Sequence, residues 1–177
     1  MKHIIILLIL LASSPAIGAI PPGLTLSGDG IVRYMGIFKV YEAELFAPPD
    51  ASPETIVNAE TPRCLRLTYA ASVKVDDITK AAGIIMARQQ DEATIARIRS
   101  ELDTLNTSYR DVKKGDVYLM CYDDTTRSTT LTFNDESLVV IESAVFASVY
   151  FGIWLNENEP ISTSLRDDLL SGLRDNR

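Results

Sequence analysis

The stretch from Leu24 to Ala47 constrains the fold more than any other part of the chain. Apolar and charged residues alternate in its second half, which is the period of a strand with one buried face. The apolar set is Tyr41, Ala43 and Leu45, and the charged set is Glu42 and Glu44. A tight reversal is expected near Met35 and Gly36. The stretch therefore predicts an antiparallel hairpin with one buried face.

Arg33 stands in the middle of this apolar hairpin, where an arginine needs a polar partner or access to water. Two interpretations remain open: a strand-end side chain that reaches solvent along its aliphatic stem, or a functional group. Arg33 and Tyr41 share a face only if the turn contains an odd number of residues, for instance 34–36. A two-residue turn would place them on opposite faces, and the sequence leaves the choice open.

Gly28 and Gly30, on the first strand, predict a bulge or a close approach of another backbone. Further on, short alternating or β-branched runs predict more strands. These are residues 64–71, 117–122, 129–133 and 138–141, the last two joined about Asn134 and Asp135.

Helices are expected between and after these strands. Residues 54–58 make at most one helical turn, and apolar residues then recur at helical spacing in two segments with a break near Asp91. Asp76 or Asp77 is the expected cap of the first segment, and Ser162 or Ser164 that of a last amphipathic helix. Residues 143–155 are apolar on nearly all sides, which is typical of a helix buried against a sheet. This order predicts an α+β domain with one sheet covered on one face.

Residues 1–19 have the pattern of a cleaved signal peptide. Lys2 precedes an unbroken apolar run from Ile4 to Ala12 that is too short to span a bilayer, and small residues follow up to Gly18 and Ala19. The sequence therefore predicts a mature domain at residues 20–177, in the periplasm or secreted, with no stable membrane span after cleavage.

Cleavage would remove His3, the only histidine of the chain. A mature protein without imidazole has no histidine base, no Ser-His-Asp arrangement and no histidine metal ligand. We therefore expect no metal, no cofactor and no catalytic residues of these kinds. The net charge of −7, without a basic run, argues against nucleic acid and anionic lipid surfaces as partners.

Cys64 and Cys121 both lie in expected strands. An exported compartment permits a disulfide between them, and a bond that closes so long a loop would stabilise the fold by about 4 kcal/mol. Two separate buried thiols are the alternative. Both remain open, because strand adjacency is not visible in the sequence.

Several motifs of the chain, in their order and spacing, resemble bacterial chalcone isomerase-like proteins. These are residues 26–33, 38–46, 66–69, 114–118 and 151–155, followed by Pro160 and residues 165–170. The resemblance covers nearly the whole mature chain. It implies an open-faced β-sandwich, in which helices pack on one face of a large antiparallel sheet and a ligand cleft lies between them.

The resemblance also implies roles for individual residues. Arg33 matches the cleft arginine, which assists cyclisation of a chalcone in the plant isomerases and grips a carboxylate in the fatty-acid-binding relatives. Tyr41 matches a position that is threonine in those enzymes and tyrosine in those binders. The helix-borne tyrosine and asparagine of the enzymes fall near Ile78 and Ile85, which would line the cleft with alkyl groups.

Three hypotheses for the function follow. The first is a non-catalytic module that binds a fatty acid or similar amphiphilic carboxylate through Arg33 and Tyr41, without a cofactor. The second is an intramolecular lyase or isomerase acting on a phenolic substrate, which the incomplete set of catalytic polar residues disfavours. The third is an interaction or structural protein without a small ligand, in which Arg33 ties the hairpin to a carboxylate.

Overall fold

The computed structural model describes residues 19–174 of the chain. The expected signal peptide, residues 1–19, lies almost wholly outside the described residues, so it stays a prediction. None of the described helices is long and apolar enough to cross a membrane.

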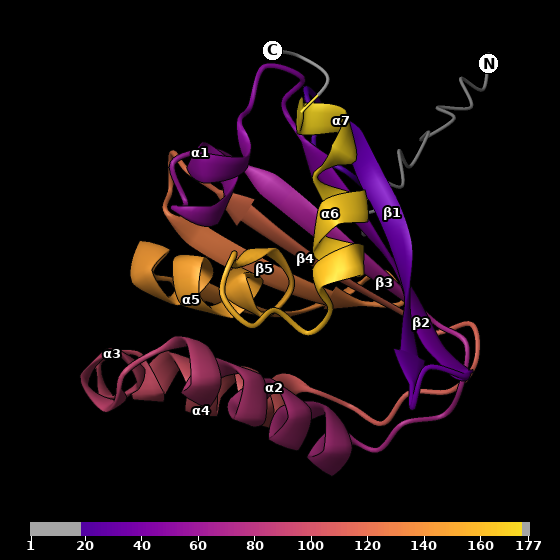
Figure 1. Cartoon of the computed structure of the whole chain (residues 1–177). Coiled ribbons are helices and arrows are strands. Elements are labelled where there is room, and N and C mark those ends of the chain that lie inside the picture. Colours follow the sequence, from indigo (N-terminus) through magenta and orange to yellow (C-terminus); the bar gives the residue numbers. More distant parts are fainter. Residues whose placement is uncertain (1–18, 175–177) are drawn as a thin grey trace, which may run out of the picture.

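One antiparallel sheet of six strands forms the centre of the molecule, with the strands side by side in the order of the sequence (Figure 1). The strands are β1 (Thr25–Tyr34), β2 (Phe38–Ala47), β3 (Arg63–Tyr69), β4 (Val117–Asp123), β5 (Ser128–Phe133) and β6 (Glu136–Glu142). The helices are α1 (Pro53–Val57), α2 (Val75–Gln89), α3 (Glu92–Arg97), α4 (Arg99–Ser108), α5 (Ala144–Leu155), α6 (Thr163–Leu169) and α7 (Ser171–Arg174).

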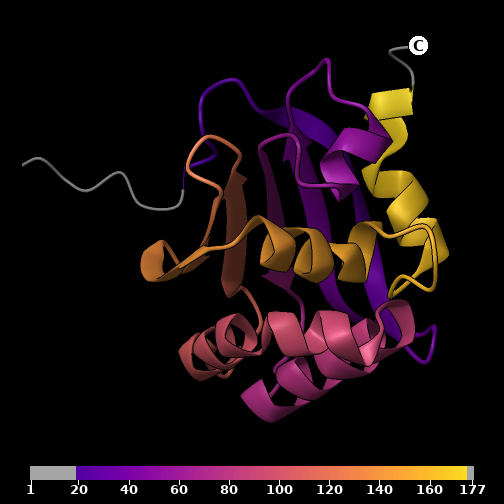
Figure 2. The ribbon, with the colours of Figure 1, turned by 90° about the vertical axis from the view of Figure 1, so that its left-hand side faces the viewer.

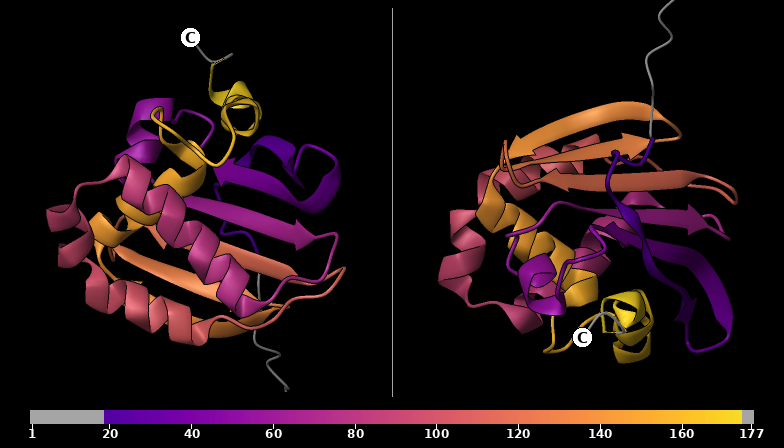
Figure 3. Two further views of the ribbon diagram at one scale, coloured as in Figure 1. Left: turned by 60° about the horizontal axis from the view of Figure 1, so that its bottom comes forward. Right: turned by 90° about the horizontal axis from the view of Figure 1, so that it is seen from above.

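The helices lie on one face of this sheet, as Figure 2 and the view from above in Figure 3 show. Helix α5 crosses the strands, with α1 on one side of it and α2 to α4 on the other, while α6 and α7 run along β1 (Figure 2). The side chains of α5 are buried on nearly all sides because the sheet, α1 and α2 surround it. The expected open-faced β-sandwich of the α+β class is confirmed.

The alternation expected in the hairpin is also observed. Tyr41, Ala43 and Leu45 are buried in the main core on the inner face, whereas Glu42 is exposed and Glu44 is half-buried. On the outer face Glu44 forms a two-pronged ion pair with Arg66, at 2.6 and 2.7 Å. The inner face of the sheet thus carries the apolar core and the outer face carries polar cross-strand contacts.

The outer face also carries the two cysteines. Cys64 on β3 lies directly opposite Cys121 on β4, and the structure joins them by a disulfide. Phe46 and Leu119 pack around it in a small cluster that is separate from the main core. The disulfide therefore braces two central strands on the face that the helices leave uncovered.

Of the two expected helix caps, that of α2 is wrong and that of α6 is confirmed, with Ser162 as the capping residue. Helix α2 starts at Val75, and its amide donates to the carboxylate of Asp111 at 2.9 Å, so a residue distant in sequence does what Asp76 or Asp77 was expected to do. Ser162 accepts the amide of Leu165 and caps α6, which makes Ser164 an ordinary first-turn residue.

The predicted break near Asp91 is present, since its carboxylate accepts the amide of Thr94 at 2.7 Å and starts α3. A further interruption at Ile98, which was not expected, divides the second segment into α3 and α4. Ile98 is almost fully buried, so packing of its side chain into the core accompanies this interruption.

Candidate functional site

Two tyrosines stand side by side on the inner face of the sheet. Tyr41 on β2 is paired with Tyr69 on β3, which places both side chains on the same face. Their rings are 5.5 Å apart between centroids and tilted by 56°. Both residues are buried, yet both also line a cleft. Their hydroxyls therefore belong to the wall of that cleft.

Trp154 on α5 fixes the direction of the Tyr41 hydroxyl. Its indole Nε1–H donates to the Tyr41 Oη at 3.0 Å in a buried hydrogen bond. Because an indole can only donate, the hydroxyl accepts this bond and keeps its own proton for another acceptor. The hydroxyl of Tyr69 has no hydrogen-bond partner among the described residues. The wall of the cleft thus presents two O–H donors for which residues 19–174 supply no acceptor.

Burial keeps these groups protonated. It raises the pKa of the Tyr41 hydroxyl, and it raises that of the Tyr69 hydroxyl further with the help of the neighbouring tyrosines. Both groups are therefore neutral donors at ordinary pH, and neither is a base. This favours binding to an oxygen acceptor over abstraction of a proton.

Besides the exposed Tyr34, three further tyrosines line the cleft. The hydroxyls of Tyr109 and Tyr150 are hydrogen-bonded to each other at 2.8 Å. The Tyr118 hydroxyl accepts the amide of Arg110 and donates to the carbonyl of the same residue. Each of these groups has a partner within the protein. The Tyr69 hydroxyl, which has no partner among the described residues, and the Tyr41 hydroxyl beside it, which only accepts a bond, are therefore the donors that we assign to the site, while the Tyr109–Tyr150 pair keeps one further O–H proton.

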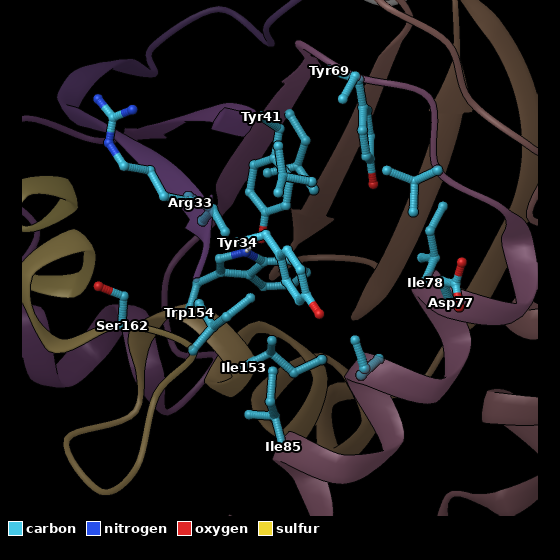
Figure 4. A pocket seen from close by; sticks show the side chains of 18 of the residues that line it. Arg33, Tyr34, Tyr41, Tyr69, Asp77, Ile78, Ile85, Ile153, Trp154 and Ser162 are labelled. Carbon is cyan, nitrogen blue, oxygen red and sulfur yellow. Dashed lines mark hydrogen bonds between the residues drawn. The ribbon is translucent and has the colours of Figure 1, made fainter. Parts of the chain in front are cut away.

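The cleft has a volume of about 990 Å³ and opens between the end of the β1–β2 hairpin, α2 and α5 (Figure 4). This is the upper end of the roughly 300–1,000 Å³ common for small-molecule sites. Ile78 and Ile85 from α2 both lie in its lining, opposite the sheet, and Ile153 from α5 adds to them. An apolar chamber with hydroxyl donors on one wall results.

Arg33 lies at the rim of this cleft. The hairpin turn closes with a hydrogen bond from the Ile37 amide to the Tyr34 carbonyl, and the register shifts between Val32 and Arg33. Val32 consequently stands opposite Tyr41, while the exposed side chain of Arg33 extends away from it (Figure 4). Among the described residues Arg33 has no hydrogen bond or ion pair. The structure thus separates the two residues that the resemblance pairs.

Other charged groups surround the opening. Lys39, which forms an ion pair with Glu42, and Lys80 on α2 line the cleft together with Arg33. Asp77 is the one acid in that lining. No group of three histidine, cysteine or acidic side chains that could hold a metal occurs among residues 19–174. The mouth of the cleft is therefore net cationic.

Comparison with known proteins fits this architecture. The family model of chalcone isomerase-like proteins matches residues 18–171. The chain belongs to this family. The crystal structure of a fatty-acid binding protein from Arabidopsis thaliana superposes with a TM-score of 0.68 at 12% identity, over 88% of this chain and 90% of that one. A likeness at that identity shows the fold alone. No curated protein sequence matches the chain.

Sequence reasoning on this chalcone isomerase-like chain missed two residues of the site. Tyr69 was visible as an alternating residue of a strand, but only the strand register places it beside Tyr41. Trp154 was visible in a helix that is apolar all round, which hides the direction of every side chain. Both residues carry a polar atom although the sequence pattern places them in the core. Because buried hydroxyls and indoles need hydrogen-bond partners, these polar atoms were the signal that could have identified Tyr69 and Trp154 as site residues.

Proposed function

We propose that this protein is a non-catalytic binding module for a fatty acid or a similar amphiphilic carboxylate, held in the cleft between the sheet and α2. The observation that carries the proposal is an apolar chamber whose wall offers the O–H protons of Tyr41 and Tyr69 without acceptors. A ligand with a long alkyl tail and a head of oxygen acceptors complements both features.

The head group is proposed to meet the two tyrosines, and the tail to lie along Ile78, Ile85 and Ile153. No cation of the described cleft lining is hydrogen-bonded to the hydroxyls of Tyr41 and Tyr69, and the Arg33 guanidinium points away from them (Figure 4), so the head group would be held there by hydrogen bonds and not by an ion pair. Arg33, Lys39 and Lys80 at the rim would attract an anion to the mouth. Arg33 would thus attract the anionic ligand to the mouth of the cleft. The competing arrangement is a direct ion pair between Arg33 and the carboxylate of the bound ligand.

Apolar groups on α2 argue against the isomerase alternative. Ile78 and Ile85 supply no proton donor where the plant enzymes carry polar residues. The arrangement of Arg33 gives no support to a structural tie through a carboxylate, because its guanidinium is exposed and unpaired among the described residues. Export to the periplasm or beyond is a further part of the proposal, supported by the leader pattern of residues 1–19 and by a disulfide.

Titration with a fluorescent fatty acid tests the proposal. The wild type should bind it, and Tyr69→Phe should weaken binding by about tenfold or more, because one donor to the head group is lost. Tyr122→Phe is the matched control, since that buried tyrosine lies outside the cleft lining, and it should bind like the wild type. Arg33→Ala should act mainly at low salt, as expected for attraction at a distance.

Other outcomes would contradict parts of this proposal. A wild type that binds no fatty acid, and from which none co-purifies, refutes the binding function. If Arg33→Ala abolishes binding and Tyr69→Phe leaves the affinity unchanged, the carboxylate binds at the rim and not at the tyrosines. The methyl ester of the same fatty acid separates the two placements further, because it keeps the acceptor oxygens and lacks the charge. It should bind at the tyrosine wall and fail at the arginine.

A further inference from the structure

The end of the β1–β2 hairpin, residues 34–38, is the most exposed apolar segment of the described chain, and we refer to it as the hairpin tip. Tyr34 and Phe38 are each 65% exposed, and Met35 and Ile37 are 75% and 72% exposed. The other exposed large apolar residues among residues 19–174 are 37% to 54% exposed, and two of them, Ile31 and Ile84, line the cleft beside the tip. Clustered exposure of this kind marks an interaction site more often than scattered exposure does.

The backbone of the tip holds these side chains away from the core. Met35 and Gly36 both have positive φ, 51° and 72°, and the Ile37 amide closes the turn on the Tyr34 carbonyl at 3.2 Å. A methionine at positive φ is strained by roughly 1 kcal/mol, and asparagine or aspartate would fit the turn better. Nothing in the packing of Met35 compensates for this, since its side chain is 75% exposed. Foldability alone therefore does not explain an apolar residue at that position.

The tip is continuous with the mouth of the cleft. Tyr34 and Phe38 belong to the tip and also line the cleft, and the exposed side chains of Ile31 and Ile84 flank them in the same lining. Apolar surface therefore runs from the outermost residues of the hairpin into the chamber. An alkyl chain could move along this surface with little contact with water.

Charge at the same place is opposite to the charge of the whole protein. The sequence carries −7, yet the described cleft lining contains Arg33, Lys39 and Lys80 against Asp77, and the balance stays positive even when Glu42, the ion-pair partner of Lys39, is counted. Salt screens charges beyond about 8 Å at physiological ionic strength, so a surface that touches the tip senses these cations more than distant acids. Composition alone argues against an anionic lipid surface, whereas the local arrangement favours one.

We propose that the hairpin tip docks on a lipid bilayer that contains anionic lipid, and that the cleft exchanges its ligand there. This inference rests on the proposed function, because the ligand would enter from the bilayer. Exposed aromatic and aliphatic side chains beside basic residues are the composition that inserts at the bilayer interface. A second copy of the chain fits less well, because stable interfaces bury about 800 Å² on each partner and the tip is one narrow turn.

Vesicle flotation of the full exported chain tests the docking. Wild-type protein should float with vesicles of phosphatidylethanolamine and phosphatidylglycerol, and less with purely zwitterionic vesicles. The double variant Met35→Asp with Ile37→Asp should lower the bound fraction by roughly tenfold, because it places charges where apolar groups insert. Neither residue lines the cleft, so titration with a fluorescent fatty acid in vesicle-free buffer should be unchanged.

Val140→Asp is the matched control, because Val140 is 54% exposed on β6, away from the cleft lining. It should float like the wild type. Wild-type protein that stays at the bottom of the gradient overturns the docking, even if it binds the fatty acid in buffer. Equal flotation of the tip variant and the wild type overturns it too, as does a dimer that the tip variant dissociates. Flotation that depends on the tip, in a protein that binds no fatty acid in buffer, would support docking and refute the proposed ligand.

Discussion

The two ends of the β1–β2 hairpin differ in how they are held. At the end where β1 begins, α6 and α7 pack against β1 so closely that side chains are excluded. A Cβ atom added to Gly28 would lie 2.0 Å from the Asp168 carbonyl oxygen, and one added to Gly172 would lie 2.4 Å from that of Ser27. At the opposite end the turn carries exposed apolar residues, and a Cβ atom added to Gly36 would meet no atom within 4 Å.

Within this one pair of strands, the end that packs against α6 and α7 contributes to stability, and the exposed end is available for function. The glycine end is fixed by close contact of backbones, so it tolerates little change. The tip lies outside the main core and contributes little to it, so its residues are free to serve recognition. The proposed ligand path lies at the end where the fold constrains the side chains least.

The largest effect is expected from Gly28→Ala, which breaks the packed end. The new methyl group would meet backbone atoms of Asp168 and Leu169, which cannot rotate away, and we expect a loss of about 3 kcal/mol or more in the free energy of unfolding. Gly83→Ala is the matched control, since a Cβ there has no atom within 4 Å and lies in α2. It should stabilise the protein by about 0.5–1 kcal/mol. Chemical denaturation measures both, and equal stability of Gly28→Ala and wild type would show that α6 is loosely docked.

A smaller effect is expected at alkaline pH, from the tyrosine wall that the hairpin shares with β3. Burial raises the pKa of Tyr41, Tyr69 and Tyr150 in the folded protein, whereas an unfolded tyrosine titrates near pH ~10. Above that pH the unfolded chain releases protons that the folded chain keeps, so stability should fall as pH rises.

Thermal melting from pH 8 to 11, with phenolate absorbance recorded in parallel, measures this dependence. Tyr69→Phe should make the fall in stability above pH 10 less steep, because one group whose pKa differs between the two states is removed. An unchanged slope in that variant would mean that the Tyr69 hydroxyl titrates normally in the folded protein.

The smallest effect on stability is expected from Arg33→Ala at the exposed end. Its side chain is solvent-exposed and has no partner among the described residues, so the free energy of unfolding should change by less than about 0.5 kcal/mol. A drop of several kcal/mol would revive the hypothesis that Arg33 is a structural tie.

Arg63 provides the contrast to Arg33. It is fully buried, donates to the carbonyls of Thr61 and Ala147, and lies over the rings of Tyr122 and Phe151 at 4.8 and 4.4 Å. Burial lowers the pKa of its guanidinium to about 10. Arg63→Ala should therefore destabilise the protein by about 2–4 kcal/mol through lost packing and hydrogen bonds, although both residues are strand arginines.

Much of the fold could be predicted from local patterns. Alternation in residues 41–45 identified the buried face of β2, apolar periodicity with Asp91 placed the helix break, and the all-apolar run at residues 143–155 identified the central helix. The glycines of β1 predicted a bulge or a close backbone approach, and both occur: the register shifts between Leu26 and Gly28, and the backbone of α6 touches Gly28. These features depend on a few neighbouring residues and on the period of their side chains.

The candidate site could be predicted only in part. The resemblance singled out Tyr41, Ile78 and Ile85, and all three lie in the lining of one cleft. It also paired Arg33 with Tyr41, but the register shift after Val32 directs the two side chains apart. A shift of one residue changes the face of a side chain without leaving any mark on the hydrophobic pattern.

Local sequence patterns were enough to predict where the strands lie, which face of β2 is apolar and which helix is buried, because propensity and periodicity are local properties. Which strand positions stand opposite one another depended on the three-dimensional fold. That choice placed Tyr69 beside Tyr41 and Cys64 beside Cys121, and the packing of α5 turned Trp154 toward the Tyr41 hydroxyl. Register and helix orientation follow from the packing of the whole core, in which every layer must fit at once, and no short stretch of sequence contains that information.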